Sequence, residues 1–139
     1  MYNIAVTAII KRNTDGRILI TKRTASKKKW PNKWTVPGGQ VEDGDFLGTP
    51  TDINNQWYHT LENAVRREVK EETGIEIYEI QYLCNIAVPG TIIISFVAIA
   101  RPQEVTLQTE ECDDFAWVTY EEAKKYDLID GLLDEIYLA

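Results

Sequence analysis

The sequence predicts an α/β domain with a mixed central sheet, and three observations lead to that prediction. Strand-like runs rich in Ile, Val and Thr recur along the chain, one central segment has helical spacing, and two short helical segments come last. Hairpin-like pairs of strands exclude a purely parallel sheet. We therefore expect helices to cover the sheet in a two- or three-layer arrangement.

Length and charge limit the possible functions. The chain has 139 residues, 44% hydrophobic and 27% charged, which predicts a single globular domain over residues 1–139. Its net charge of −7 does not favour non-specific binding to a nucleic acid polymer or to an anionic membrane. An anionic ligand would need a local source of positive charge, and a bound divalent cation would supply it.

The first half of the chain reads as strands followed by a long loop. Residues 3–12 and 17–23 are strand-like and flank the turn sequence NTDG at 13–16, so we expect a hairpin. Residues 34–39, WTVPGG, predict a short strand that ends in a turn. Residues 40–60 have no clear period and are predicted as mostly loop. A loop of that length within a compact domain is often functional.

The second half alternates between helix and strand. Residues 61–73 have helical spacing, and Gly74 is placed to end that helix. Pro89 and Gly90 mark a turn between two further strands. The remaining predicted elements are strands at 75–87, 91–100 and 114–119 and short helices at 120–126 and 131–139.

Compartment and redox state follow from what the chain contains. Its first residues form an apolar run without a basic region or a cleavage site, which argues against a signal peptide. No segment approaches the roughly 20 apolar residues of a membrane span. The two cysteines, Cys84 and Cys112, have no metal-ligand spacing and fit a reducing compartment. We expect a soluble, cytoplasmic protein.

The helix at 61–73 carries its acidic residues on an unexpected face. Leu61, Ala64 and Val65 define an apolar stripe at helical spacing. The same stripe continues with three glutamates, Glu68, Glu71 and Glu72. These carboxylates are therefore expected where core contacts would otherwise lie.

Such an arrangement opposes local electrostatics. Like charges three or four residues apart each cost about 0.2–0.5 kcal/mol, and acidic groups near a helix C-terminus cost roughly 0.3–1 kcal/mol. Burying unpaired carboxylates costs more. A hard divalent cation, which prefers carboxylate oxygens, removes all three penalties. The alternative is a surface helix whose glutamates form ion pairs with Lys and Arg.

Two segments together resemble the box of the Nudix hydrolase (MutT-like) family. They are PGGQVEDGD at 37–45 and RREVKEETGI at 66–75, in which Gly39 opens the pattern and Arg67 to Ile75 match its second half without a gap. The resemblance extends over most of the chain, because the order of predicted elements suits that family's α/β/α sandwich. We therefore expect this fold, with a mixed central sheet.

The chain departs from the family pattern at two places. In the pattern, five residues separate the first glycine from a Glu, and at that position this chain has Asp45. Residues 46–66 then separate Asp45 from Arg67, 21 residues where the pattern has seven, so 14 residues are inserted. We assign the insert to residues 46–59 and expect it to loop out of the domain.

The resemblance implies a reaction and a set of roles. The family hydrolyses a nucleoside diphosphate linked to another group, with water attacking phosphorus and Mg²⁺ or Mn²⁺ required. By resemblance, Glu71 and Glu72 are metal ligands and Glu68 is either a ligand or the base that activates water. Arg67 would orient a carboxylate by hydrogen bonding. The carbonyl oxygen of Gly38 would complete the metal coordination.

A further carboxylate is expected from the loop before a late tryptophan. Many family members supply one there, and this chain offers TEECDDFAW at 109–117. We favour Glu111, followed by Glu110; Asp113 and Asp114 are the other candidates. An acidic surface loop is the competing interpretation.

Aromatic and basic residues are candidates for substrate contacts. Stacking on a base is open to Trp30, Trp34, Trp57 and Tyr58, of which we favour the last three. Core packing for Trp34, and anchoring of the insert for Trp57 and Tyr58, are the competing interpretations. Phosphate oxygens could be met by Lys22, Arg23 or Lys27 to Lys29, of which Arg23 is our choice.

The sequence leaves alternative functions open. The interrupted box is also compatible with a non-enzymatic module that binds or senses a nucleotide. A diphosphate-dependent isomerase would share the fold but would need a positioned acid–base pair, often with a cysteine. The expected partner is a nucleotide or a nucleotide derivative. A homodimer is expected on general grounds.

Overall fold

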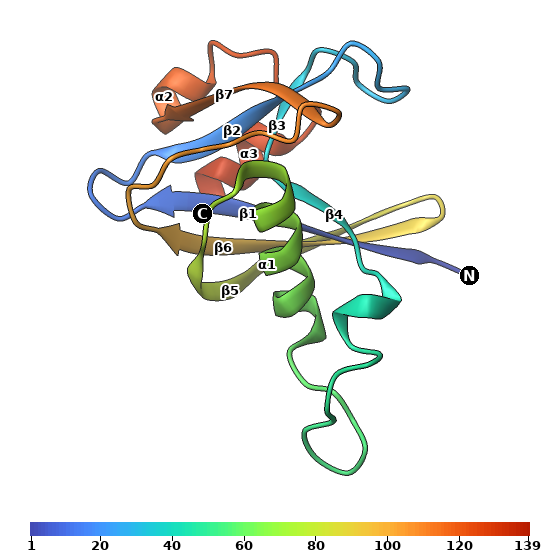
Figure 1. Ribbon diagram of the computed structural model, residues 1–139. Coiled ribbons are helices and arrows are strands. Elements are labelled where there is room, and N and C mark those ends of the chain that lie inside the picture. Colours follow the sequence, from blue (N-terminus) through green and yellow to red (C-terminus); the bar gives the residue numbers. More distant parts are fainter.

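The structure is a computed structural model that describes residues 1–139, and Figure 1 shows its elements. In chain order these are β1 (Asn3–Arg12), β2 (Ile18–Arg23), β3 (Trp34–Thr35), β4 (Gly38–Gln40), a 3-10 turn η1 (Asp43–Asp45), α1 (Thr60–Thr73), β5 (Tyr78–Val88), β6 (Thr91–Ala100), β7 (Cys112–Val118), α2 (Tyr120–Ala123) and α3 (Leu132–Leu138).

Strand β1 organises the sheet. It runs parallel to β6 along its whole length, from the pair Asn3–Thr91 to the pair Arg12–Ala100. On its other edge it pairs antiparallel with β4 and then with β2, so the sheet divides along β1. Strand β5 extends the sheet beyond β6, and β2 pairs with β3 and β7. The sheet is therefore mixed, as predicted.

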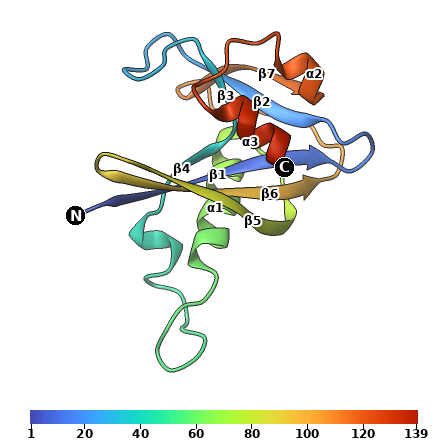
Figure 2. The same ribbon diagram turned by 180° about the vertical axis from the view of Figure 1, so that it is seen from behind.

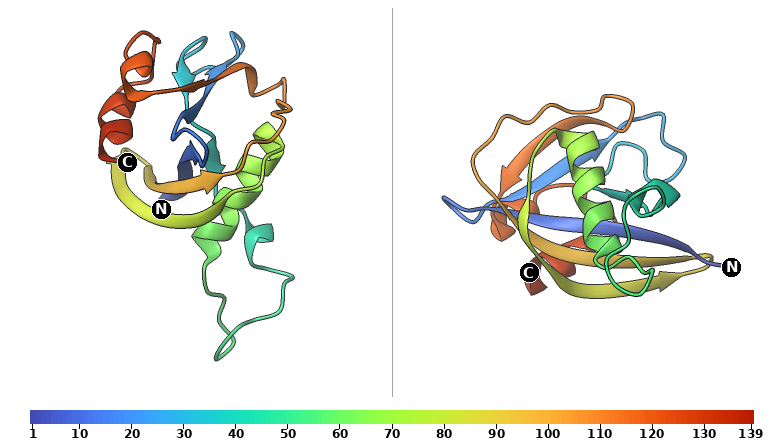
Figure 3. Two further views of the ribbon diagram at one scale, coloured as in Figure 1. Left: turned by 90° about the vertical axis from the view of Figure 1, so that its left-hand side faces the viewer. Right: turned by 60° about the horizontal axis from the view of Figure 1, so that its bottom comes forward.

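Helices lie on both sides of this sheet. Helix α1 covers one side, and α2 and α3 lie on the opposite side, as the view from behind in Figure 2 and the left view in Figure 3 show. The predicted α/β/α sandwich is confirmed in this arrangement.

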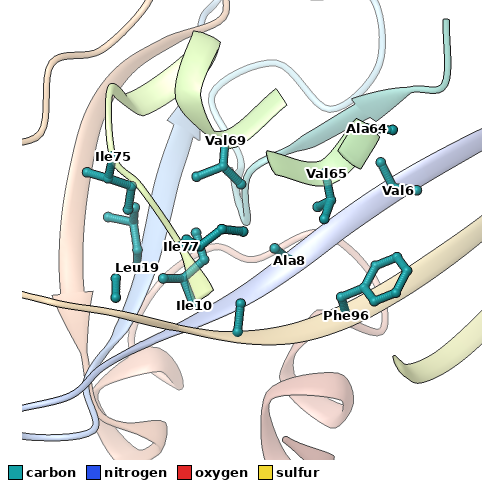
Figure 4. Close-up of a cluster of buried hydrophobic side chains, with 12 residues drawn as sticks. Val6, Ala8, Ile10, Leu19, Ala64, Val65, Val69, Ile75, Ile77 and Phe96 are labelled. Atoms are coloured by element: carbon teal, nitrogen blue, oxygen red, sulfur yellow. The ribbon is translucent and has the colours of Figure 1, made fainter. Parts of the chain in front are cut away.

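Two buried clusters hold the layers together, and β1 supplies both. Because successive side chains of a strand point to opposite faces, Ala8 and Ile10 pack toward α1 while Ile9 packs toward α3. Figure 4 shows the first cluster, in which Val65 and Val69 of α1 lie over the strands. Burial on both faces explains why β1 reads as a nearly continuous apolar run.

Helix α1 begins and ends close to the predicted positions. His59 precedes it in a left-handed conformation, and Gly74 ends it with φ 75°. The Gly74 amide donates to the Lys70 carbonyl oxygen at 2.9 Å. This left-handed glycine is the predicted C-terminal stop.

Three sequence-based boundaries were wrong. Gly38 and Gly39 were predicted in a turn, but they form β4, because these two residues have no Cβ atoms and therefore fit closely beside β1. Residues 75–77 were predicted as strand, but Gly74 redirects the chain and the Ile75 and Ile77 side chains fill the core before β5 begins. The helix predicted at 120–126 is shorter than expected, because α2 ends at Ala123.

The insert at 46–59 projects away from the sheet at the N-terminal end of α1 (Figure 1). Its contacts are mostly internal. The rings of Phe46 and Trp57 meet edge to face with centroids 5.4 Å apart, and the Trp57 indole N–H donates to the Thr49 carbonyl oxygen at 3.0 Å. These internal contacts fold residues 46–59 back on themselves.

The structure also describes the lengths of the helices and the state of the two cysteines. None of the helices has the length and apolar character needed to cross a membrane. Cys84 and Cys112 are both free thiols.

Candidate active site

Two glycines of β4 let helix α1 approach the sheet. Gly38 and Gly39 pair with Thr7 and Val6 of β1. A Cβ atom on Gly38 would overlap the Val6 carbonyl oxygen, and one on Gly39 would overlap the carboxylate of Glu68. The absence of these two side chains therefore places acidic groups of the helix directly against strand backbone.

Arg67 joins the glycine segment to the helix. Its Nε lies 2.5 Å from Asp45 Oδ1 and one terminal nitrogen lies 3.1 Å from Asp45 Oδ2, while the same nitrogen donates to the Gln40 carbonyl oxygen. The other terminal nitrogen contacts Glu68 at 3.0 Å and Glu71 at 3.1 Å. The shorter Asp45 side chain and the 14-residue insertion therefore leave a bidentate contact between the two segments.

The Asp45 carboxylate is held in its ionised form. Its side chain is only 1% exposed, and this burial opposes ionisation. Hydrogen bonds from Arg67 and from the Glu42 amide outweigh the burial, so the pKa of Asp45 lies below its ordinary value. In return, the hydrogen bond to Asp45 raises the pKa of Arg67. Both charges are therefore fixed at neutral pH.

Glu72 has the opposite environment. Burial, followed by the nearby charges of Glu68 and Glu111, raises the pKa of Glu72 to about 8, although the Gly38 amide partly offsets this shift. Lys27 and Arg67 pair with Glu111 and Glu68 rather than with Glu72. A carboxyl group that is buried beside other carboxylates is protonated at neutral pH unless a cation joins it.

Glu68 and Glu71 differ although both contact Arg67. Burial raises the pKa of Glu68, and the charge of Arg67 works against that shift. The Glu71 side chain is 53% exposed, so the apolar stripe of the helix does not continue through it as the sequence suggested. The helix therefore presents a graded row of carboxylates, from buried Glu72 to solvent-facing Glu71.

Of the four late acidic residues, the structure brings Glu111 to this row. Lys27 forms an ion pair with it, and the Glu111 carbonyl oxygen accepts a hydrogen bond from the Thr24 amide. Glu110, Asp113 and Asp114 are exposed and line no cavity. The pairing of Lys27 was not expected, because a basic run in a loop more often faces solvent.

Together these residues enclose an acidic pocket of about 280 Å³. Its lining contains no hydrophobic residue and comprises Gly38, Gly39, Gln40, Glu42, Glu68, Glu71, Glu72, Gln108 and Glu111. Sequence analysis missed Glu42 and Gln108. Glu42 lies within the matched glycine segment, whereas Gln108 arrives through a backbone hydrogen bond to Glu72, which no local pattern reveals.

The donor set of the acidic pocket fits a hard divalent cation, because it consists of carboxylate, amide and backbone oxygens around a buried acid without a cation of its own. No three His, Cys, Asp or Glu side chains converge as a finished ligand cluster in this conformation. Arg67 and Lys27 hold some of the carboxylates instead.

A second cavity of about 220 Å³ adjoins the acidic pocket and shares Gly38, Gly39, Glu72 and Glu111 with it. Arg23 lines this cavity, as does Trp30. Cys112 also lines it, but burial raises the pKa of its thiol. A protonated, buried thiol is a poor acid–base or nucleophilic group, which disfavours the isomerase alternative.

The other aromatic candidates lie elsewhere. Trp34 packs edge to face on Tyr126 with centroids 4.9 Å apart and belongs to the cluster beneath α3. Trp57 and Tyr58 line a separate cavity of about 510 Å³ between the insert and the start of α1. That cavity shares no lining residue with the acidic pocket or its neighbour.

Comparison with known proteins identifies the family. The model of the NUDIX domain matches residues 1–136. Nudix hydrolase 19, chloroplastic, of Arabidopsis thaliana is 28% identical over 129 residues, which cover 88% of this chain and 25% of that protein. The chain therefore spans about a quarter of the length of that relative.

One further relative is similar in sequence, and one solved structure is similar in fold. Nucleoside triphosphatase NudI of Klebsiella pneumoniae is 29% identical over 134 residues, which cover 82% of this chain and 81% of that protein. The NUDIX domain of Shewanella oneidensis NrtR, solved with ADP ribose, shares the fold with a TM-score of 0.75 at 20% identity, covering 99% of this chain and 86% of that one. This chain is a member of the Nudix family.

Proposed function

We propose that this protein is a divalent-metal-dependent hydrolase of a diphosphate linkage in a nucleoside di- or triphosphate or a nucleotide derivative, with water attacking phosphorus. The observation that carries the proposal is Glu72, a carboxyl group that is only 8% exposed and lines the acidic pocket together with Glu68 and Glu111. Burial and these neighbouring charges raise the pKa of Glu72. Buried carboxyl groups with strongly shifted pKa values are typical of functional sites, where a bound cation offsets the free-energy cost of burying the charge. The similarity to a nucleoside triphosphatase supports a nucleotide as substrate.

Mg²⁺ or Mn²⁺ would be held by carboxylates of Glu68, Glu71, Glu72 and Glu111 and by the carbonyl oxygen of Gly38. When bound, such a cation neutralises the diphosphate, polarises its phosphoryl oxygens and lowers the pKa of water. Two features favour such binding. Glu72 is buried, and β4 has no Cβ atoms at Gly38 and Gly39, so the carboxylates lie close to backbone oxygens.

The other residues of the pocket position these carboxylates and the substrate. Arg67 fixes Glu68 through a 3.0 Å contact and is itself fixed by Asp45. Glu68 is the candidate base, because burial raises its pKa toward neutrality, and a metal-ligand role for it stays open. Arg23 lines the adjoining cavity, where its guanidinium can meet a phosphate oxygen.

A release assay tests the proposal. Purified protein is incubated with nucleoside triphosphates, nucleotide sugars and dinucleoside polyphosphates, with Mg²⁺, Mn²⁺ or chelator, and phosphate and pyrophosphate are measured. We expect metal-dependent release that Glu72→Gln abolishes while the variant remains folded. Glu62→Gln, on the same helix but outside the acidic pocket, is the control and should retain activity.

The competing hypothesis is a nucleotide-binding module without catalysis. It predicts that nucleotide binds but that no phosphate or pyrophosphate appears at any metal concentration. The ion pairs of Arg67 and Lys27 with the pocket carboxylates are the observation that favours it. Metal-dependent release by the wild-type protein would exclude it.

Homodimer formation and the lack of binding to nucleic acid polymers stay predictions. Light scattering of the purified protein tests the first. The net charge of −7 supports the second, and a filter-binding assay with single- and double-stranded RNA and DNA tests it.

A further inference from the structure

An apolar arm of the cleft extends away from the acidic pocket. We define it by Trp30, Ile86, Val88, Ile93, Ile129 and Leu132, which line a cavity of about 330 Å³. It shares Thr7, Trp30, Thr35, Val36, Ile93 and Ile129 with the cavity that adjoins the acidic pocket. The carboxylates and the apolar arm therefore belong to one continuous cleft.

Two walls of the apolar arm are tied to the sheet by backbone hydrogen bonds. Ile93 belongs to β6, which is paired with β1 along its length. The Ile129 amide donates to the Trp34 carbonyl oxygen at 3.0 Å, so β3 anchors the segment before α3. Trp34 thus supports the arm from behind, while Trp30 lies at its surface with 43% exposure and presents a ring on which a flat group can stack.

The polar residues that line the apolar arm are two threonines, Thr7 and Thr35, and two carboxylates, and no Lys, Arg or His lines it. The two carboxylates are Asp130 and Glu135. Thr7 donates to Ser95 at 3.0 Å, and Ser95 donates to Glu135 Oε1 at 2.5 Å. Ser95, at the centre of this chain of hydrogen bonds, is only 1% exposed. The Cys84 thiol donates to the same Glu135 oxygen at 3.6 Å, so Oε2 is the Glu135 oxygen left to accept from a ligand.

These features select a particular chemistry. Ionised carboxylates only accept hydrogen bonds, so they favour a ring edge with N–H donors and repel both phosphate and ring acceptors. Two adjacent donors are matched by two acceptor oxygens, which Glu135 Oε2 and the Asp130 carboxylate can supply together. Guanine has such an edge, with a ring N–H next to an amino group, whereas adenine places a ring acceptor beside its amino group and hypoxanthine lacks the second donor.

We propose that the apolar arm binds the base of the nucleotide and that Glu135, assisted by Asp130, selects a purine whose edge presents adjacent N–H donors. This inference rests on the proposed function, because it places the phosphates of the same substrate in the acidic pocket. Trp30 stacks on the ring, and the apolar walls exclude water from its faces.

The test compares GTP with ITP, which differs by one amino group, and with ATP. For the wild-type protein we expect kcat/KM for GTP to exceed that for ITP by about 10- to 100-fold, the effect of a hydrogen bond to a charged group. Glu135→Gln keeps one acceptor oxygen, which can still accept from Ser95, and replaces the other by an amide N–H donor, so it should bring the GTP-to-ITP ratio close to one. Asp134→Asn, an exposed neighbour on α3, is the matched control and should leave the ratio unchanged.

The failures of the two proposals are distinguishable. Binding of GTP, ITP and ATP with Mg²⁺ is measured by calorimetry on the same variants, whose melting temperatures show that they are folded. Discrimination in binding without turnover would overturn the proposed hydrolase and retain the base selection. Turnover in which the wild-type protein does not discriminate, or in which Glu135→Gln lowers GTP and ITP equally, would overturn the base selection and retain the hydrolase.

Discussion

The two ends of helix α1 carry similar residues in opposite environments. At the N-terminal end, Glu62 lies near His59 at 3.3 Å beside the insert, and Arg66 faces solvent. Toward the C-terminal end, Glu68 and Glu72 are pressed against β4. Charges of the first kind contribute little to stability, whereas charges of the second kind are costly without a partner. The free-energy cost of burying the carboxylates, rather than the number of charges, therefore distinguishes the two ends of the helix.

The buried end should make the stability of the metal-free protein depend on pH. Glu72 has a pKa of about 8 in the folded chain against an ordinary 4.5, so the folded state holds a proton that the unfolded state releases. Stability therefore falls as pH rises between these values. From about pH 5.5 to about pH 8.5 we expect a loss on the order of 3 kcal/mol in the free energy of unfolding.

Urea unfolding in the presence of chelator measures this loss. Glu72→Gln should remove it, Glu62→Gln at the other end of the helix should retain it, and Mg²⁺ should restore stability at the higher pH. An equal loss in the Glu72→Gln variant would assign the effect to other groups.

Adding a methyl group at a glycine should affect catalysis at the buried end of the helix but not near the insert. A Cβ atom at Gly39 would displace the Glu68 carboxylate, whereas one at Gly44, near the insert, meets nothing within 4 Å. A displacement of about 1 Å at a reacting group costs on the order of 100-fold in rate. We expect Gly39→Ala to lower kcat/KM by about that factor and Gly44→Ala to be neutral. Equal activities would show that Glu68 is not needed at its present position.

Substitutions of two aspartates, one buried beside Arg67 and one in the insert, should differ in their effect on stability. Asp45 is buried and bound to Arg67 by two contacts, while Asp52 in the insert accepts one hydrogen bond from the Tyr58 amide at 2.9 Å. Removing one partner of a largely buried pair destabilises more than removing an exposed acceptor. We expect Asp45→Asn to reduce the free energy of unfolding by about 2 kcal/mol and Asp52→Asn by less than about 1 kcal/mol, both measured by urea unfolding at neutral pH.

The smallest effect is expected for Trp57, which the sequence assigned to the substrate. In the structure it packs on Phe46 and lines the separate cavity at the insert. We expect Trp57→Ala to lower stability by about 1 kcal/mol with little change in kcat or KM, since edge-to-face pairs contribute on that order. Faster amide hydrogen exchange confined to the insert would support this role, whereas a clearly raised KM would restore the sequence-based assignment.

The sequence determined the parts of this protein that depend on local pattern. The Ile- and Val-rich runs predicted the strands, Gly74 predicted the end of α1, and the spacing of the glutamates predicted an acidic face on one helix. Each of these features depends on residues that are neighbours along the chain. That is why pattern alone was sufficient for them.

The tertiary structure decided which of these residues meet. Glu71 and Glu72 are adjacent in sequence, but a helix turns about 100° per residue, so packing against β4 buries only one of them. Trp30 and Trp34 are four residues apart, yet one faces the cleft and the other packs beneath α3. Gln108, Glu111 and Glu135 come from distant segments. Their positions follow from burial and long-range pairing, which no local sequence pattern encodes.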